Sequence, residues 1–180
     1  MLATLLTLTA LAAPPPLSAE ANPAAPAGVR AGFGQLVGPA WSCQGSNLQT
    51  DGAWQDSPGR ARWLFQYVLD GHAVQDFWYP PAESQGPPGT NLRTYDPDSD
   101  RWMMVWATSR QAHFDHFEAQ VEDGRIIMTG EREASGAFPA HHVRITFSDI
   151  GPGEFHWRYE ASPDGDSDHY REQARIHCQR

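Results

Sequence analysis

An acidic and a basic residue lie on segments that otherwise alternate apolar side chains, which is where a ligand's polar end would be held. Asp76 occupies the apolar face of one such run, and Arg93 shares a face with Tyr95. Charges inside an apolar interior are costly unless they pair. We therefore expect Asp76 to pair with Arg93 or with Arg144 and to orient a ligand carboxylate or hydroxyl. The alternatives are a purely structural ion pair and side chains that face solvent.

Imidazoles form the second chemical group, and metal binding is the chemistry they would serve. Four of the eight histidines occur as two close pairs in the sequence, His113 with His116 and His141 with His142. Residues an odd number apart on a strand face opposite sides, so only one of each pair could reach a shared site. A set of three ligands would need Asp115 or His113, one of His141 and His142, and a third group such as His72. No spacing typical of a metal motif is present. We expect ordinary surface histidines and no metal site.

Catalytic patterns are weak. The chain has no G-x-S-x-G motif, and no cysteine is free if its two cysteines pair. Asp76 or His116 could act as a general acid or base in isomerase or hydratase chemistry, but no catalytic residue is assigned. Haem held by one histidine, His116 or His156, is a further alternative. Apart from that alternative, we predict no cofactor.

The elements that must position these residues are strands. Alternating apolar and polar runs, separated by turn residues, continue along the chain with almost no helical pattern. Asp70-Gly71 and Asp123-Gly124 are preferred hairpin dipeptides. About ten strands are predicted, at residues 36–45, 62–69, 72–79, 91–96, 101–109, 113–122, 125–133, 141–149, 154–162 and 168–179.

The only two cysteines, Cys43 and Cys178, stand at opposite ends of this series. A disulfide requires its Cα atoms to be about 4.4–6.8 Å apart, so a bond between them would make the first and last strands neighbours. Sequential hairpins that close in this way form an all-β, up-and-down antiparallel barrel. Two stacked sheets are the alternative.

A barrel of this size holds side chains and one small ligand, and seven tryptophans are available to line or fill the interior. Period-two alternation fixes the lining only up to a choice of face. The expected ligand-binding residues are Trp63, Phe65, Asp76, Trp78, Arg93, Tyr95, Trp106, His116, Trp157 and Tyr159.

The N-terminal part differs in composition from the rest. Residues 1–21 begin with an uncharged apolar stretch that is too short to span a membrane and resembles a secretory signal, although no Lys or Arg precedes it. Residues 22–34 continue a Pro- and Ala-rich stretch and are predicted to be a disordered linker. The barrel domain then covers residues 35–180. A signal and a disulfide together favour a periplasmic or secreted protein.

Charge excludes two classes of partner. The formal net charge is −9, with no basic stripe. Binding to nucleic acid needs Lys and Arg to neutralise phosphates, and an anionic membrane surface needs the same. We therefore expect neither partner.

Short motifs resemble a known superfamily. Gly38-Pro39-Ala40-Trp41 is similar to the glycine–tryptophan signature of lipocalin-like, or calycin, barrels, with one extra residue between the two. That resemblance implies a basic residue near the chain end, Arg175 or Arg180, packed across Trp41. The chain resembles a set of uncharacterised bacterial lipocalin-like domains more closely. Their recurring sequence motifs are similar to those at residues 68–71, 92–97, 101–106, 117–124 and 155–165.

The resemblance covers residues 36–180 and implies a barrel, but it brings no agreed function. From barrel and composition together we expect an exported protein that binds a small apolar or amphipathic molecule.

Overall fold

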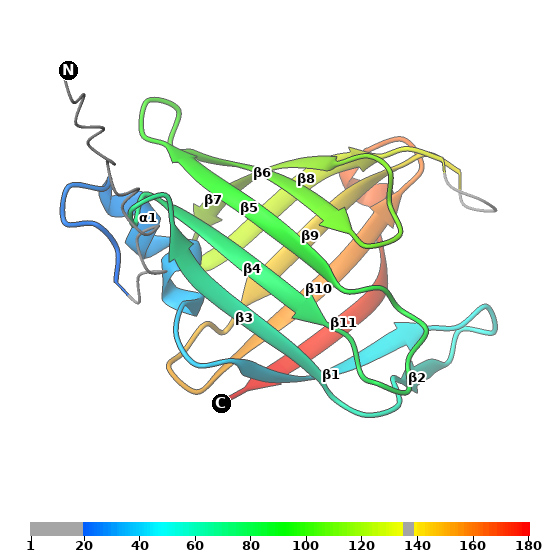
Figure 1. Ribbon diagram of the computed structural model, residues 1–180. Helices are drawn as coiled ribbons and strands as arrows, with labels where there is room; N and C mark the ends of the chain where they lie inside the picture. The colour runs from blue at the N-terminus through cyan, green and yellow to red at the C-terminus, as the bar shows by residue number, and fades with distance from the viewer. Residues whose placement is uncertain (1–19, 135–138) are drawn as a thin grey trace, which may run out of the picture.

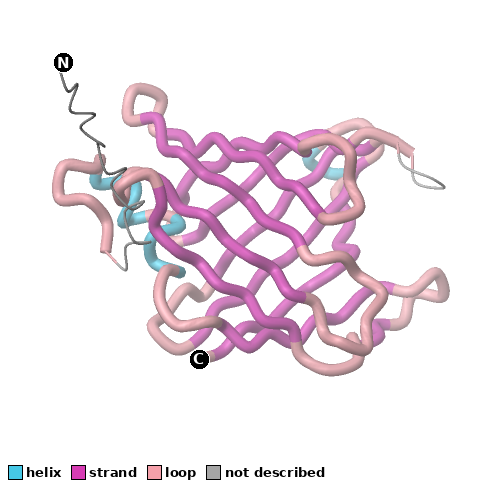
Figure 2. The backbone as a smooth tube through the Cα atoms, in the orientation of Figure 1, coloured by secondary structure: helices cyan, strands magenta, loops and turns pink. Residues whose placement is uncertain are grey.

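The computed structural model describes residues 20–134 and 139–180 and shows a closed antiparallel β-barrel (Figure 1). Eleven strands form one sheet. Ten of them close the barrel, and the eleventh, β2, pairs with β1 beside it. Figure 2 shows how the strands cross the barrel axis obliquely and enclose its interior. The predicted all-β closed barrel is confirmed, and the two-sheet alternative is excluded.

Each barrel strand pairs with the next one along the chain, except that β3 pairs with β1 and skips β2. The strands are β1 (Trp41–Leu48), β2 (Trp54–Asp56), β3 (Ala61–Val68), β4 (Ala73–Tyr79), β5 (Gly89–Asp96), β6 (Arg101–Thr108), β7 (Asp115–Glu122), β8 (Arg125–Arg132), β9 (His141–Ser148), β10 (Glu154–Ser162) and β11 (Arg171–Gln179).

The two predicted hairpin dipeptides form turns of different length. Asp123 and Gly124 both have positive φ and join β7 to β8 as a two-residue turn, with Glu122 opposite Arg125. The loop between β3 and β4 is longer and covers residues 69–72. Within it, Leu69, Asp70 and Gly71 all have positive φ. In both cases the glycine adopts the left-handed conformation without a steric penalty.

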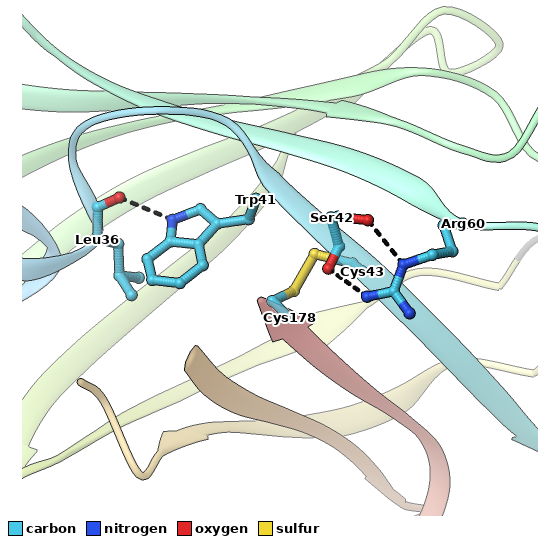
Figure 3. The surroundings of a disulfide bond; sticks show 6 residues. All are labelled: Leu36, Trp41, Ser42, Cys43, Arg60 and Cys178. Carbon is cyan, nitrogen blue, oxygen red and sulfur yellow. Dashed lines mark hydrogen bonds between the residues drawn. A yellow bond between two sulfur atoms is a disulfide. The ribbon is translucent and has the colours of Figure 1, made fainter. Parts of the chain in front are cut away.

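The seam of the barrel lies between β1 and β11. Cys43 stands directly opposite Cys178 in the antiparallel register, and their sulfurs form a disulfide (Figure 3). The predicted Cys43–Cys178 bond is therefore present, and both residues are fully buried. It joins two strands that the backbone hydrogen bonds already hold side by side.

Trp41, the first residue of β1, is covered by a basic residue near the chain end, as the resemblance implied. Its indole Nε1–H donates to the Leu36 carbonyl at 2.9 Å. The Arg180 guanidinium carbon lies 3.7 Å from the centre of the Trp41 ring system. Arg180 also donates to the Leu36 and Val37 carbonyls. Of the two candidates, Arg180 covers Trp41, whereas Arg175 covers Trp54 of β2 at 4.0 Å.

A short helical segment closes one end of the barrel, where a disordered linker was expected. It consists of α1 (Ala27–Ala31) and the 3₁₀ helix η1 (Phe33–Leu36). Figure 1 shows α1 against the end of the barrel, beside the end of β3. Ala25, Val29 and Phe33 are buried in the core. The prediction of a linker at 22–34 is wrong for the described residues, because apolar side chains recur at a helical spacing that the Pro- and Ala-rich composition obscured.

We call residues 25–36 the plug. At Gly32 the plug backbone passes close to the Trp102 indole, where a Cβ would lie 2.5 Å from Nε1. Only glycine allows that approach without displacing the ring.

Strand ends were predicted less well than strand identities. The first strand begins at Trp41, not at residue 36, because Leu36 is the last residue of the plug and residues 37–40 connect the plug to β1. The expected signal segment 1–21 lies almost wholly outside the described residues. Within the described part of the chain, no helix has the length and apolar character needed to cross a bilayer.

Candidate ligand-binding cavity

The barrel encloses a cavity of about 300 Å³. At one end its wall includes Arg93, which contacts the plug residue Phe33. At the other end it includes Asn47 at the end of β1 and Ser57 just after β2. The wall between is mostly apolar and contains Trp63, Trp78, Trp106, Phe117, Met128, Ile145, Phe147, Trp157 and Ile176.

Arg93 and Asp76 form an ion pair with no exposed surface at the inner end of the cavity. Arg93 Nη2 lies 2.5 Å from Asp76 Oδ2. Asn91 donates to the same carboxylate, through its backbone N–H at 3.1 Å to Oδ1 and through Nδ2 at 3.4 Å to Oδ2. The guanidinium carbon lies 4.4 Å from the Phe33 ring centre and 5.6 Å from that of Phe65. The Asp76–Arg93 alternative is thus the one realised.

This inner polar group is incompletely satisfied. Among the described residues, Arg93 Nε and Nη1 and Asn91 Oδ1 are buried and have no hydrogen-bond partner. Trp63 Nε1, elsewhere in the cavity wall, is in the same condition. Burial lowers the pKa of Arg93, while the charge of Asp76 and its hydrogen bond oppose that shift. Buried polar atoms are nearly always paired, so these free donors and this free acceptor suit the polar group of a bound molecule.

A second polar group lies toward the other end of the cavity, around Asp115. The carboxylate of Asp115 is buried, and Arg132 Nη2 approaches it at 2.9 Å. Gln111 Nε2 donates to it at 2.8 Å, and His113 Nε2 lies 3.5 Å away. Arg132 is in the cavity wall. Asp115 therefore fixes the position of a cation that a ligand can reach.

Tyr159 and His141 extend this second group. His141 Nδ1 lies 2.9 Å from the Pro139 carbonyl, and its Nε2 lies 2.8 Å from Tyr159 Oη. A carbonyl only accepts, so a neutral His141 carries its proton on Nδ1, and its Nε2 accepts a hydrogen bond from the Tyr159 hydroxyl. Burial raises the pKa of Tyr159, and the nearby Arg132 opposes that shift. The phenol is therefore held beside a base at the cavity wall.

Most of the residues predicted to contact a ligand face the interior. Those in the cavity wall are Trp63, Trp78, Arg93, Trp106, Trp157 and Tyr159. Phe65 and Asp76 are buried in contact with Arg93 and support it. Tyr95 packs against Trp102 at 5.5 Å between ring centres and lies beside Gly28 of the plug, away from the cavity.

His116 is a correction. It is exposed on the outer face of the barrel, whereas its neighbours Asp115 and Phe117 are buried inside. The predicted inward face of β7 was wrong, because alternation alone does not decide which face of a strand is inside. The polar side chain of Asp115 made its face look like the exposed one. His156, the other haem-ligand candidate, is also half exposed and stacks on His177.

Arg144 lies on the outer face as well, where it forms a two-point ion pair with Glu160 at 2.9 Å for each contact. Hydrogen bonding to Glu160 raises the pKa of Arg144. As for metal ligands, no cluster of three or more His, Cys, Asp or Glu with suitable geometry occurs among residues 20–134 and 139–180.

Sequence reasoning missed several residues of the cavity wall, of which Asn91, Arg132 and Phe117 matter most here. Asn91 precedes Arg93 by two positions and so shares its face, a signal that was available. Arg132 lies at even spacing from Ile126 and Met128 and so shares their inward face, but the adjacent Ile127 leaves the phase of this strand ambiguous in the sequence.

No family model matches the chain, and no curated protein is significantly similar to it.

Proposed function

We propose that this protein binds a small apolar or amphipathic molecule inside the barrel. One observation carries the proposal: an apolar cavity of about 300 Å³ whose wall holds buried polar atoms with no partner among the described residues. Ligand sites are typically apolar cavities of this size or larger with a few placed polar groups. A cavity that served only packing would be filled, because interiors are close-packed.

Two further proposals concern class and location. The Trp41–Arg180 stack and the up-and-down barrel support assignment to a calycin-type, lipocalin-like fold. The buried Cys43–Cys178 disulfide supports a periplasmic or secreted location, because such bonds persist in oxidising compartments.

Native mass spectrometry of freshly purified protein, followed by denaturing extraction, tests the binding function. We expect a non-covalent adduct that is released on unfolding. A neutral fluorescent probe, N-phenylnaphthylamine, provides a second measurement, since energy transfer from the wall tryptophans reports its binding.

A matched pair of variants locates the site. Ala174 lies in the cavity wall, whereas Ala107 on β6 follows the inward-facing Trp106 and so points outward. Ala174→Phe should lower probe affinity at least about tenfold by filling the space, and Ala107→Phe should leave it unchanged. Equal effects of the two substitutions, or no probe binding and no adduct in the parent protein, would remove the proposal.

A second candidate function is acid–base catalysis on the bound molecule. The observation that favours it is the Tyr159–His141 hydrogen bond at the cavity wall, with the Pro139 carbonyl orienting the imidazole. His141→Gln would abolish turnover of a candidate substrate but leave its affinity nearly intact if this function is correct. A parent protein that binds the molecule and returns it unaltered would exclude catalysis on that molecule.

A further inference from the structure

The inner polar group of the cavity has a composition that discriminates between ligand head groups. Asp76, Asn91 and Arg93 lie on the adjacent strands β4 and β5. Both Asn91 Nδ2 and Arg93 Nη2 approach the same oxygen, Asp76 Oδ2. Two side chains that reach one oxygen atom lie close together, so one small head group could contact both of them.

Charge is already balanced at this point. The single positive charge of Arg93 is paired with the carboxylate of Asp76, and neither side chain has any exposed surface. A ligand carboxylate would be a second anion beside one cation, in a place without bulk water. Burying an uncompensated charge is strongly unfavourable.

Hydrogen-bonding capacity is not balanced. Arg93 Nε and Nη1 are donors without a partner, and Asn91 Oδ1 is an acceptor without one, among the described residues. The aromatic rings of Phe33 and Phe65 lie near the guanidinium and attract its charge, but they supply no oxygen or nitrogen acceptor. A complementary head group must both accept and donate a hydrogen bond.

We propose that the inner polar group of the cavity selects an uncharged head group with both an acceptor and a donor, such as a hydroxyl, a primary amide or a protonated carboxylic acid, attached to an apolar body. This inference rests on the proposed function and specifies its ligand class. Carboxylic acids are bound in the protonated form, so the cavity raises their pKa. Alcohols and amides are bound without any change in proton content.

Calorimetric titration with octanol, octanamide and octanoic acid tests this inference, because the three probes share one apolar chain. Near neutral pH we expect octanol and octanamide to bind at least about tenfold more tightly than octanoic acid, which is then ionised. Between about pH 7 and about pH 5, the affinity for octanoic acid should rise close to tenfold per pH unit, as uptake of one proton requires.

Octanol is the control for titration of the protein itself. The ionisable groups that face the cavity or support its wall are Asp76, Arg93, Asp115, Arg132, Tyr159, His141 and Arg175. A pH-dependent change in the cavity that affects an uncharged ligand would appear with octanol as well, so the difference between the two probes reports the effect of the charge on the head group.

Paired variants on β5 add a readout that does not depend on pH. Asn91→Ala removes the free acceptor and should weaken octanol about fivefold, the effect of one hydrogen bond. Thr94→Ala, on the exposed face of the same strand, should have no effect. If Asn91→Ala does not fold, the comparison of head groups still decides the question.

The possible failures are distinct. Octanoate that binds at neutral pH as tightly as octanol overturns the head-group inference and leaves the binding function intact. If none of the three compounds binds, and the fluorescent probe does not bind either, the proposed function fails with it.

Discussion

Arg93 is held in place by contacts that do not require a ligand. Asp76 fixes one side of its guanidinium, and the rings of Phe33 and Phe65 lie against it. A donor that is already oriented loses little conformational entropy when a ligand binds. The same arrangement makes the residue important for stability.

Replacing one member of the ion pair should therefore cost more than replacing both. Arg93→Met leaves the Asp76 carboxylate buried without a cation, which should destabilise the protein by about 3–5 kcal/mol. The double variant Asp76→Leu/Arg93→Met removes both charges and should be less destabilised than the sum of the two single variants. Urea unfolding measures all three, and strictly additive effects would contradict the pairing.

Tyr159 should reduce stability at alkaline pH. Its pKa is raised in the folded protein, chiefly by burial, so above about pH 10 the unfolded chain loses this proton while the folded protein retains it. The stabilising contribution is complete below that pH and disappears as the pH rises through the folded-state pKa. Tyr159→Phe should lessen the alkaline fall in unfolding free energy, and an unchanged slope would be evidence against the shift.

Alternation indicated which side chains share a face but not which face is inside. On β3 and β10 the inward phase was predicted correctly, because Trp63 and Trp157 are large aromatic residues that mark it. On β7 the inward face begins with a charged residue, Asp115, and His116 was chosen instead. The carboxylate is tolerated inside because Arg132 and Gln111 bond to it, contacts that only the folded barrel supplies.

At the scale of elements, the plug completes the core. Phe33 packs edge-on against Trp102 at 5.1 Å and against Phe147 at 5.5 Å between ring centres. Together with its contact to Arg93, this makes η1 part of the structure that supports the inner end of the cavity.

Truncation of the Phe33 side chain should destabilise the protein strongly. Phe33→Ala leaves a cavity between the plug and the barrel and should cost about 3–5 kcal/mol of unfolding free energy. Phe114→Ala is the matched control, because Phe114 is 61% exposed and should lose almost nothing. Chemical denaturation of both variants provides the comparison. Similar losses in the two would mean that the plug is not part of the core.

Elements with strong alternation were predictable, and short or weakly patterned ones were not. The strand at residues 154–162 was predicted with the bounds that β10 has, since Phe155, Trp157 and Tyr159 alternate with polar residues. β2 has three residues, none of them buried, and no periodicity could reveal it. It exists because β1 extends beyond its pairing with β3 and offers a free edge at Ser46–Leu48.

For the whole molecule, closure depends on the pairing of β1 with β11. The disulfide spans 135 positions of sequence at this seam. The backbone pairing of residues 42–47 with residues 174–179 also holds the two strands together, so we expect the barrel to persist without the covalent bond.

Reduction of the Cys43–Cys178 disulfide should lower the unfolding free energy by about 4–5 kcal/mol in the chain-entropy model, and measured losses are often smaller. Circular dichroism should show the same strand content in oxidised and reduced protein before denaturation. Equal denaturation midpoints in the two states would show that the crosslink contributes nothing to stability.

The seam also bears on how fast the barrel assembles. Every other pairing joins strands that follow one another closely in the chain, so local hairpins can form early, whereas the two ends of the barrel must search for each other. In an oxidised denatured chain the two ends of the barrel sequence are already held together, because the disulfide closes the unfolded polypeptide between Cys43 and Cys178 into a ring. Oxidised protein should consequently refold faster than reduced protein, with the crosslink acting mainly on the rate of folding and little on the rate of unfolding.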